Sequence, residues 1–240
     1  MKGELVGLID SDDYIALDMF EALYRIMKDN DADLSVCDLI YVDEDGNILD
    51  KRVGPPLQNH VLSREQALRG LVDGSLACFG SSVKLHKAKI FNNIRFPEGL
   101  ILEDNIAAHR IIGESNKVVT TDKMLYFYVQ HEGSILANVR SSRFHELHFK
   151  SVIALCMDRY NYLRSIGMNE LAEFSFVWLY GLIVNMLKEA NYFQVRNKIN
   201  KYIVPTAIHL WRSGNRKNRL RIVKLFLVIF RSLFKPFVKE

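Results

Sequence analysis

The chain of 240 residues has little cysteine, and no cysteine pattern that would hold a metal. Its three cysteines, Cys37, Cys78 and Cys156, lie far apart and show no ligand spacing. We therefore expect reduced, mostly buried thiols in a cytosolic protein. Glycine-rich phosphate loops, internal repeats and low-complexity segments are also absent from the sequence. The first residues lead into a short strand-like run with acids behind it, which is unlike a signal peptide.

The sequence does have a large apolar fraction and an uneven distribution of charge. Hydrophobic residues make up 49% of the chain, which predicts a packed core and excludes disorder. The net charge is +4, but residues 1–211 carry 23 basic and 27 acidic side chains, whereas residues 212–240 carry 9 basic side chains and one acid, Glu240. A basic tail of this kind usually meets phosphates, either of lipid or of nucleic acid.

Up to about residue 138, the spacing of apolar residues predicts strands that alternate with helices. Ser63 begins one of these helices with a capping-box pattern, and the acidic segment 43–47 is expected to form a turn. This alternation predicts an α/β fold with a mixed sheet covered by helices. The expected strands are residues 4–9, 33–42, 117–121 and 124–130, and the expected helices are residues 17–27, 63–72 and 103–113.

Beyond residue 138 the sequence predicts an all-helical region. We expect helices at residues 142–165 and 169–190 and a shorter one at residues 194–202. Residues 174–187 are apolar almost all round, which is typical of a helix that is central to a bundle or pressed on a membrane. We therefore divide the chain into residues 1–138 and residues 139–240.

An acidic cluster follows the first predicted strand and is the strongest candidate for chemistry. Asp10, Asp12 and Asp13 place three carboxylates within four positions. Like charges this close repel each other unless a cation or water lies among them. Carboxylates suit Mg²⁺ or Mn²⁺, which would clamp a diphosphate leaving group. The alternative is a solvated acidic turn that caps the next helix. A haloacid-dehalogenase motif fits less well, because it needs Thr or Val at the position of Tyr14. A calcium loop also fits less well, because it needs a Gly in the middle of the loop and a Glu near its end, and neither is present.

The basic tail has the pattern of a helix that lies on an anionic membrane surface. Its basic residues recur at three-, four- and seven-residue spacing, and aromatic and aliphatic residues form a wide apolar face. A bundle helix with a solvated basic face is the alternative, and the aliphatic content argues against nucleic acid as a partner. The basic set is Lys217, Arg221, Lys224, Arg231, Lys235 and Lys239; the apolar set is Leu220, Val223, Phe226, Leu227, Phe230, Phe234 and Phe237.

Several blocks over residues 1–138 resemble, in the same order, family-2 inverting glycosyltransferases, especially those of bacterial capsule and exopolysaccharide synthesis. The acidic cluster within residues 3–15 looks like the Asp-x-Asp segment of that family. Residues 126–135 resemble a block usually written Tyr-x-Tyr-x-x-Arg-x-x-Ser-Ile, with His131 in place of the arginine. The other similar blocks are residues 32–37, residues 84–99 and the pair Glu103-Asp104. The fold that the resemblance implies is the C-terminal part of a GT-A domain, which has a Rossmann-like mixed sheet.

The resemblance also implies roles for individual residues. Asp10 and Asp12 would hold the nucleotide ribose and the metal-bound diphosphate, with Asp13 as a supporting or alternative ligand. In the Glu103-Asp104 pair, Asp104 would be the general base that takes the proton of the acceptor hydroxyl. The alternative for this pair is an acidic helix N-terminus favoured by the helix dipole. His131 would be a metal ligand or a phosphate contact, or else a loop histidine with no such role.

The implied activity is inverting transfer of a sugar from a nucleoside diphosphate sugar, in which the nucleotide is UDP. The implied acceptor is a surface-polysaccharide or lipid-linked saccharide. Mn²⁺ or Mg²⁺ would be the cofactor, and the enzyme would lie in the cytoplasm, peripheral on the inner face of the cell membrane. In the family, a further nucleotide-binding half precedes the Asp-x-Asp strand, whereas this chain begins near that strand. Two hypotheses stay open: an enzyme completed by a missing N-terminal half or by other polysaccharide-assembly proteins, and a catalytically inactive, truncated remnant acting at most as a membrane-associated interaction module.

Overall fold

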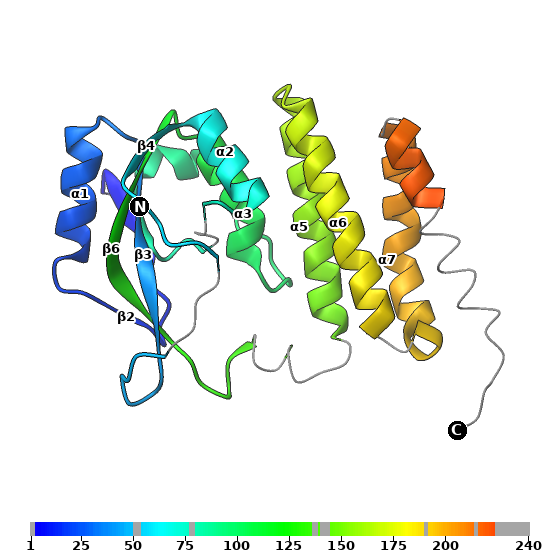
Figure 1. Ribbon diagram of the computed structural model, residues 1–240, viewed down its shortest axis with the longest axis horizontal. Helices are drawn as coiled ribbons and strands as arrows, with labels where there is room; N and C mark the ends of the chain where they lie inside the picture. The colour runs from blue at the N-terminus through cyan, green and yellow to red at the C-terminus, as the bar shows by residue number, and fades with distance from the viewer. Residues whose placement is uncertain are drawn as a thin grey trace. The chain divides into compact units, whose positions relative to one another are not determined.

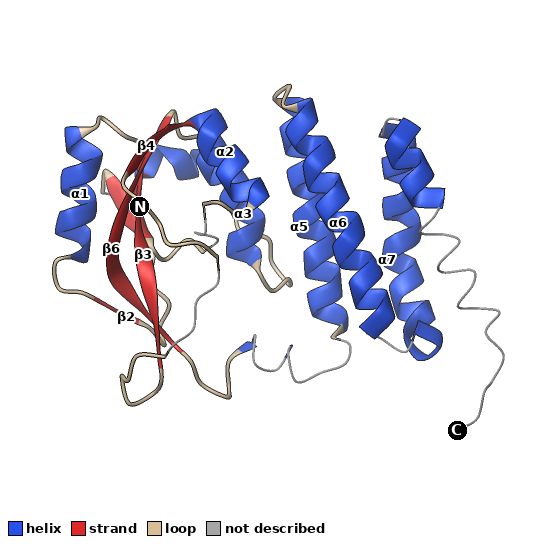
Figure 2. Cartoon of the chain, in the orientation of Figure 1, coloured by secondary structure: helices blue, strands red, loops and turns tan. Residues whose placement is uncertain are grey.

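The computed structural model describes residues 3–49, 54–76, 80–135, 139, 145–189, 192–213 and 216–223. The chain divides into two compact units. The first, here called the α/β unit, comprises Met1–Gly99 and Glu103–Asn138, and the second, the helical unit, comprises Leu100–Leu102 and Val139–Glu240. Within the described residues, all the strands belong to the α/β unit (Figure 2). The predicted α/β fold class is confirmed.

A mixed sheet of six strands forms the centre of the α/β unit (Figure 1). The strand order is β1-β5-β3-β6-β2, and β4 also pairs with β6. Strands β3 and β6 are parallel, and all the other pairs are antiparallel. The strands are β1 Leu5–Gly7, β2 Tyr14–Ile15, β3 Leu34–Val42, β4 His60–Ser63, β5 Lys84–Lys87 and β6 Lys117–Val129.

The directions of these strands determine which loops meet. Strands β1 and β3 both run antiparallel to β5, and β3 is parallel to β6, so β1, β3 and β6 all run the same way. The loops after Gly7 and Val129 therefore leave from one edge of the sheet, which we call the C-terminal edge. Strand β5 begins at this edge with Lys84. In open α/β sheets, ligands bind beyond the carboxyl ends of the strands.

Helices cover both faces of the sheet (Figure 1). Helix α1, Met19–Asp29, lies on one face and buries Met19, Leu23 and Met27, which recur at four-residue spacing. Helices α2, Arg64–Asp73, and α3, Glu103–Gly113, lie on the other face. The predicted capping box at Ser63 is confirmed, because its hydroxyl accepts from the Gln66 backbone N–H and the Gln66 side chain accepts from the Ser63 N–H. A 3₁₀ helix, η1, spans Ala88–Asn92.

Two features of the sheet differ from the sequence prediction. The segments expected as two strands, 117–121 and 124–130, form the single strand β6. The interruption is only a shift in register against β3, near Asp38, and β6 continues because β4 pairs with its first half and β2 with its second half. Strands β2, β4 and β5 were not predicted, because segments of two to four residues are too short to show a period of two.

The helical unit contains α5, Glu146–Ser165, α6, Asn169–Glu189, and α7, Tyr192–Ser213, followed by a short helix at residues 216–223. The expected short helix at 194–202 was wrong in length, since α7 continues through Pro205. Pro205 lacks the N–H of a helical hydrogen bond, but burial of Ile203, Ala207 and Leu210 favours continuation of the helix.

Helix α6 was predicted to be apolar almost all round, but only some of its apolar side chains are buried in the structure. Phe176 and Ile183 are buried, whereas Phe174, Val177 and Trp178 are exposed. None of the helices in the described ranges is long and apolar enough to cross a membrane. Cys37 and Cys156 are buried, as expected. Cys78 and tail residues 224–240, with most of the predicted amphipathic helix, lie outside the described residues.

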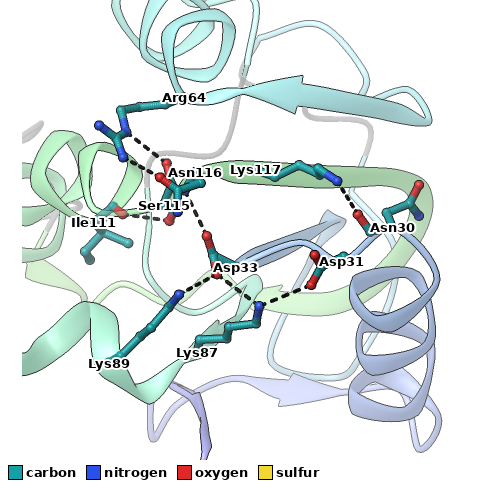
Figure 3. A network of polar contacts seen from close by, with 10 residues as sticks. All are labelled: Asn30, Asp31, Asp33, Arg64, Lys87, Lys89, Ile111, Ser115, Asn116 and Lys117. Atoms are coloured by element: carbon teal, nitrogen blue, oxygen red, sulfur yellow. Dashed lines mark hydrogen bonds and ion pairs between the residues drawn. The ribbon is translucent and has the colours of Figure 1, made fainter.

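A buried aspartate joins three strands at the edge of the sheet opposite to the C-terminal edge (Figure 3). One carboxylate oxygen of Asp33 lies 3.0 Å from Lys87 Nζ and 2.9 Å from Lys89 Nζ, and the other accepts from the Asn116 backbone N–H at 2.9 Å. Burial alone would raise the pKa of Asp33, but the hydrogen bonds from Lys89, Asn116 and Lys87 outweigh it and lower the pKa to about 2. The ionised carboxylate therefore stabilises the folded state.

We expect Asp33→Asn to lower the free energy of unfolding by about 2 kcal/mol at neutral pH, because the pKa depression is that large in energy. The measurement is urea unfolding. Asp31→Asn is the matched control, since Asp31 is 94% exposed and its carboxylate lies 3.8 Å from the same Lys87 Nζ. Equal losses in the two variants would contradict a special role for Asp33. The contribution of Asp33 to the free energy of unfolding should be fully present above about pH 4 and be lost as the pH falls through about 2.

Candidate functional site

The acidic loop after β1 is fixed by residues from the end of β6. The Asp13 carboxylate accepts from the Tyr126 hydroxyl at 2.6 Å and from the Val129 backbone N–H at 2.9 Å. The Tyr126 hydroxyl also accepts from the Asp10 backbone N–H at 3.3 Å. Tyr126 is 1% exposed, so its hydroxyl is a rigid point to which both ends of the loop are attached. Asp13 is thus a structural anchor, whereas Asp10 and Asp12 lie exposed.

His131 lies beside Asp12 at the same edge of the sheet. Its Nε2 is 3.1 Å from a carboxylate oxygen of Asp12, and the side chains of His131 and Asp12 are 25% and 51% exposed. Strand β6 ends at Val129, so this contact follows from the shared direction of β1 and β6. The structure therefore brings His131 to the acidic loop, where it can orient Asp12 or meet an anionic group held there.

The Glu103-Asp104 pair forms the first turn of α3. One oxygen of Asp104 accepts from the Asn105 backbone N–H at 2.7 Å, and the other faces Gly80, where an added Cβ would lie 3.2 Å away. The residue before the pair, Leu102, has a φ of +64°, a conformation that side chains with a Cβ rarely adopt. A strained residue that precedes an acidic pair is typical of a functional segment.

Lys84 lies buried next to this pair. It is 3% exposed, and its Nζ donates to the Gly80 carbonyl, so Gly80 contacts both Lys84 and Asp104. Burial raises the pKa of Asp104, and Glu103 and Asp10 raise it further, whereas the Asn105 N–H and the Lys84 charge oppose the rise. A carboxylate in this setting is more basic than one in water.

The two acidic segments are close enough to repel each other. The pKa of Asp10 is raised first by partial desolvation of its carboxylate and then by the charges of Asp12 and Glu103, while a hydrogen bond from Ser82 lowers it. Burial, together with Asp12 and Asp10, also raises the pKa of Asp13, against its hydrogen bonds to Tyr126 and Val129. A cation among these groups would remove the repulsion.

The residues at this edge fit a divalent metal that is only partly coordinated by protein. No group of three or more histidine, cysteine or acidic side chains in the described part of the chain is arranged to hold a metal ion by itself. Mg²⁺ usually takes one or two carboxylates and completes its shell with water and phosphate oxygens. The exposed carboxylates of Asp10 and Asp12 can supply this number, and the remaining positions would be open to a diphosphate.

All six residues that the sequence singled out lie in the α/β unit, and electrostatic or direct contacts connect them. They are Asp10, Asp12, Asp13, Glu103, Asp104 and His131. No individual role was predicted for Tyr126, Ser82, Gly80 or Lys84, which support them. Lys84 could not be identified from the sequence, because the four residues of β5 are too few to show a strand pattern.

Comparison with known proteins relates the chain to glycosyltransferases. No protein-family model matches it. Over 140 residues it is 29% identical to each of two curated proteins of Streptococcus pneumoniae serotype 4, glycosyltransferase GlyG and glycosyltransferase GlyA. The match takes in 56% of this chain, 46% of GlyG and 20% of GlyA, so the chain spans less than half the length of either relative.

Among solved structures, the chain is similar in fold to S. aureus TarS 1–349, crystallised in complex with UDP-GlcNAc. The TM-score is 0.58 with 16% sequence identity, and the match covers 86% of this chain and 58% of that one. At this identity the likeness concerns the fold, which is the mixed α/β architecture with appended helices described above.

Proposed function

We propose that the α/β unit transfers a sugar from a UDP-linked sugar donor to a surface-polysaccharide or lipid-linked saccharide acceptor, with inversion of the anomeric configuration. One observation carries the proposal: the acidic loop after β1 and the acidic pair that begins α3, more than ninety residues apart in the sequence, lie within electrostatic range at the C-terminal edge of the sheet. This edge is where open α/β sheets bind ligands. The relation to glycosyltransferases and the TarS-like fold support it.

In this proposal Asp104 is the general base and the acidic loop holds the leaving group. Mn²⁺ or Mg²⁺, bound by Asp12 and Asp10, would neutralise charge on the diphosphate. The acceptor hydroxyl oxygen forms a bond to the anomeric carbon while the bond from that carbon to the diphosphate oxygen breaks. Asp104 takes the hydroxyl proton as the oxygen attacks, since a neutral alcohol is a weak nucleophile. Attack on the face opposite to the leaving group inverts the anomeric configuration.

The surrounding residues position these groups. Tyr126 and the Val129 N–H hold Asp13, and through it the loop that presents Asp10 and Asp12. The contact with His131 orients the Asp12 carboxylate. Glu103, exposed beside Asp104, raises the basicity of its neighbour by charge repulsion. Such pre-organisation is worth more than the same groups free in water, because it costs no reorganisation during the reaction.

The experiment is calorimetric titration of the full chain with UDP-N-acetylglucosamine, with and without Mn²⁺. We expect binding that requires Mn²⁺ and is lost in Asp12→Ala, because removal of one carboxylate leaves the cation with too few ligands. Asp18→Ala is the control, since Asp18 is an exposed aspartate near the same loop whose side chain makes no capping bond to α1. A folded chain that binds no UDP sugar with Mn²⁺ would overturn the proposal that this chain transfers a sugar by itself.

A further inference from the structure

The helical unit exposes apolar side chains where α7 and the helix at residues 216–223 meet. On α7 the exposed residues recur at four- and three-residue spacing, so they form one face of the helix. The largest, Trp211, is 44% exposed, and Leu220 on the following helix is 58% exposed. We call this set the apolar surface; its members are Val204, Ile208, Trp211, Leu220 and Val223.

Contacts within the unit fix the two helices beside each other. Arg219 Nε donates to the Trp211 carbonyl at 3.0 Å, which ties the helix at 216–223 to the end of α7. On the inner side of this helix, Asn218 and Ile222 are buried, and the Asn218 side chain donates to Glu173 of α6. The helix is therefore seated by its buried side, which leaves Leu220 and Val223 exposed.

The segment of the chain that carries the apolar surface has charges of one sign only. Between Glu189 and Glu240 the sequence contains no aspartate or glutamate, whereas it contains 12 lysine and arginine residues. Four of these side chains, Arg212, Arg216, Lys217 and Arg219, are exposed next to the apolar surface. A half-exposed tryptophan among aliphatic residues with a rim of cations is the composition of surfaces that lie in the headgroup region of an anionic bilayer.

We propose that the apolar surface and its four cations bind the surface of an anionic phospholipid membrane. A second copy of this chain is a poorer occupant, because a symmetric contact would bring the same cations together, and the segment that carries them has no acid to pair them. The inference thus adds the exposed face of α7 to the tail pattern predicted at residues 216–239, of which the structure describes residues 216–223. This inference concerns a different surface from the sugar-transfer site and does not depend on that function.

Tryptophan fluorescence tests the inference, because the chain has only two tryptophans, Trp178 and Trp211. In Trp178→Phe only Trp211 reports, and its emission should shift to the blue when vesicles of phosphatidylcholine and phosphatidylglycerol are added. In Trp211→Phe only Trp178 reports; it is exposed to a similar extent, 49%, but is not part of the apolar surface, so its emission should stay unchanged. Pure phosphatidylcholine vesicles should give a smaller shift for Trp211.

Charge reversal provides the second arm. Arg216→Glu with Lys217→Glu should weaken vesicle binding in a flotation assay at least about tenfold, because each cation near an anionic surface contributes and each reversal adds repulsion. Vesicle binding with no shift of the Trp211 emission would overturn the inference, because it assigns binding to the tail alone. Equal shifts of the Trp178 and Trp211 emission would also overturn it. So would a blue shift of Trp211 that grows with protein concentration in the absence of vesicles, because it indicates self-association.

Discussion

Asp104→Asn should lower the rate of sugar transfer by about 10²- to 10⁴-fold, the usual contribution of a general base. The amide keeps the size of the side chain but cannot take the acceptor proton. Because Asp104 lies in α3 and not in the acidic loop, Mn²⁺-dependent affinity for the UDP sugar should change by less than about threefold. The measurements are kcat with a saccharide acceptor and calorimetric titration with the donor.

Glu103→Gln is the matched control for this prediction. It removes a neighbouring carboxylate in the same turn of α3, but one that is exposed and that acts on Asp104 only through its charge. Its effect on kcat should therefore be much smaller than that of Asp104→Asn. If Asp104→Asn abolished donor binding and transfer together, Asp104 would have a structural role; if it left the rate unchanged, the base would be a different group.

The second large effect is a loss of stability in acid that depends on His86. This histidine of β5 is fully buried, its Nδ1 lies 3.1 Å from the Val6 carbonyl, and its Nε2 has no hydrogen-bond partner among the described residues. Burial lowers its pKa to about 3, with a further contribution from the charge of Lys84. A protonated ring would place a charge and an unpaired donor in the core.

Because the folded-state pKa is depressed, the unfolded chain binds the proton more readily. The stability due to neutral His86 is fully present above the unfolded pKa of about 6.5 and is lost as the pH falls toward 3. At about pH 4.5 the wild type should have lost about 2 to 3 kcal/mol through this group. The raised pKa values of Asp10, Asp13 and Asp104 increase the stability of the folded state as the pH falls, which is opposite to the effect of His86. A variant that lacks His86 but retains these aspartates is therefore needed for comparison.

That variant is His86→Asn, whose short amide retains a donor near the Val6 carbonyl. Urea unfolding at about pH 7 and about pH 4.5 should give a smaller pH dependence for His86→Asn than for the wild type, and the difference isolates His86. His60→Asn, at an exposed histidine of β4, is the control and should match the wild type. An identical pH dependence for His86→Asn and the wild type would contradict the prediction. The window lies above the range in which the contribution of Asp33 to stability changes with pH.

How much of this molecule could be predicted depended on the range of the interactions involved. The capping box at Ser63 and helix α1 depend on neighbours within four residues, so local spacing was enough for both. The short strand β5 was not visible locally, because its four residues form a strand only between β1 and β3. Helix α7 was predicted too short, because its continuation past Pro205 depends on burial against other helices.

The candidate site shows the same division. Three carboxylates in four positions identify the acidic loop from sequence alone, and the family resemblance pointed to Asp104 and His131. The supporting contacts could not be predicted, because the Tyr126 hydroxyl reaches Asp13 across 113 positions of sequence. The contact of Gly80 with both Lys84 and Asp104 likewise depends on how the start of β5 meets α3. Such contacts leave no local pattern.

Uptake of Mn²⁺ by the full chain, followed by electron paramagnetic resonance with and without UDP, tests the central claim most directly. If the exposed carboxylates of the acidic loop and a diphosphate together hold one cation, the wild type should bind Mn²⁺ tightly only when UDP is present. Asp12→Asn should lose this uptake, and Asp104→Asn, outside the metal shell, should retain it. Uptake that does not depend on Asp12, or a folded wild type that takes up no Mn²⁺ with UDP, would contradict the account.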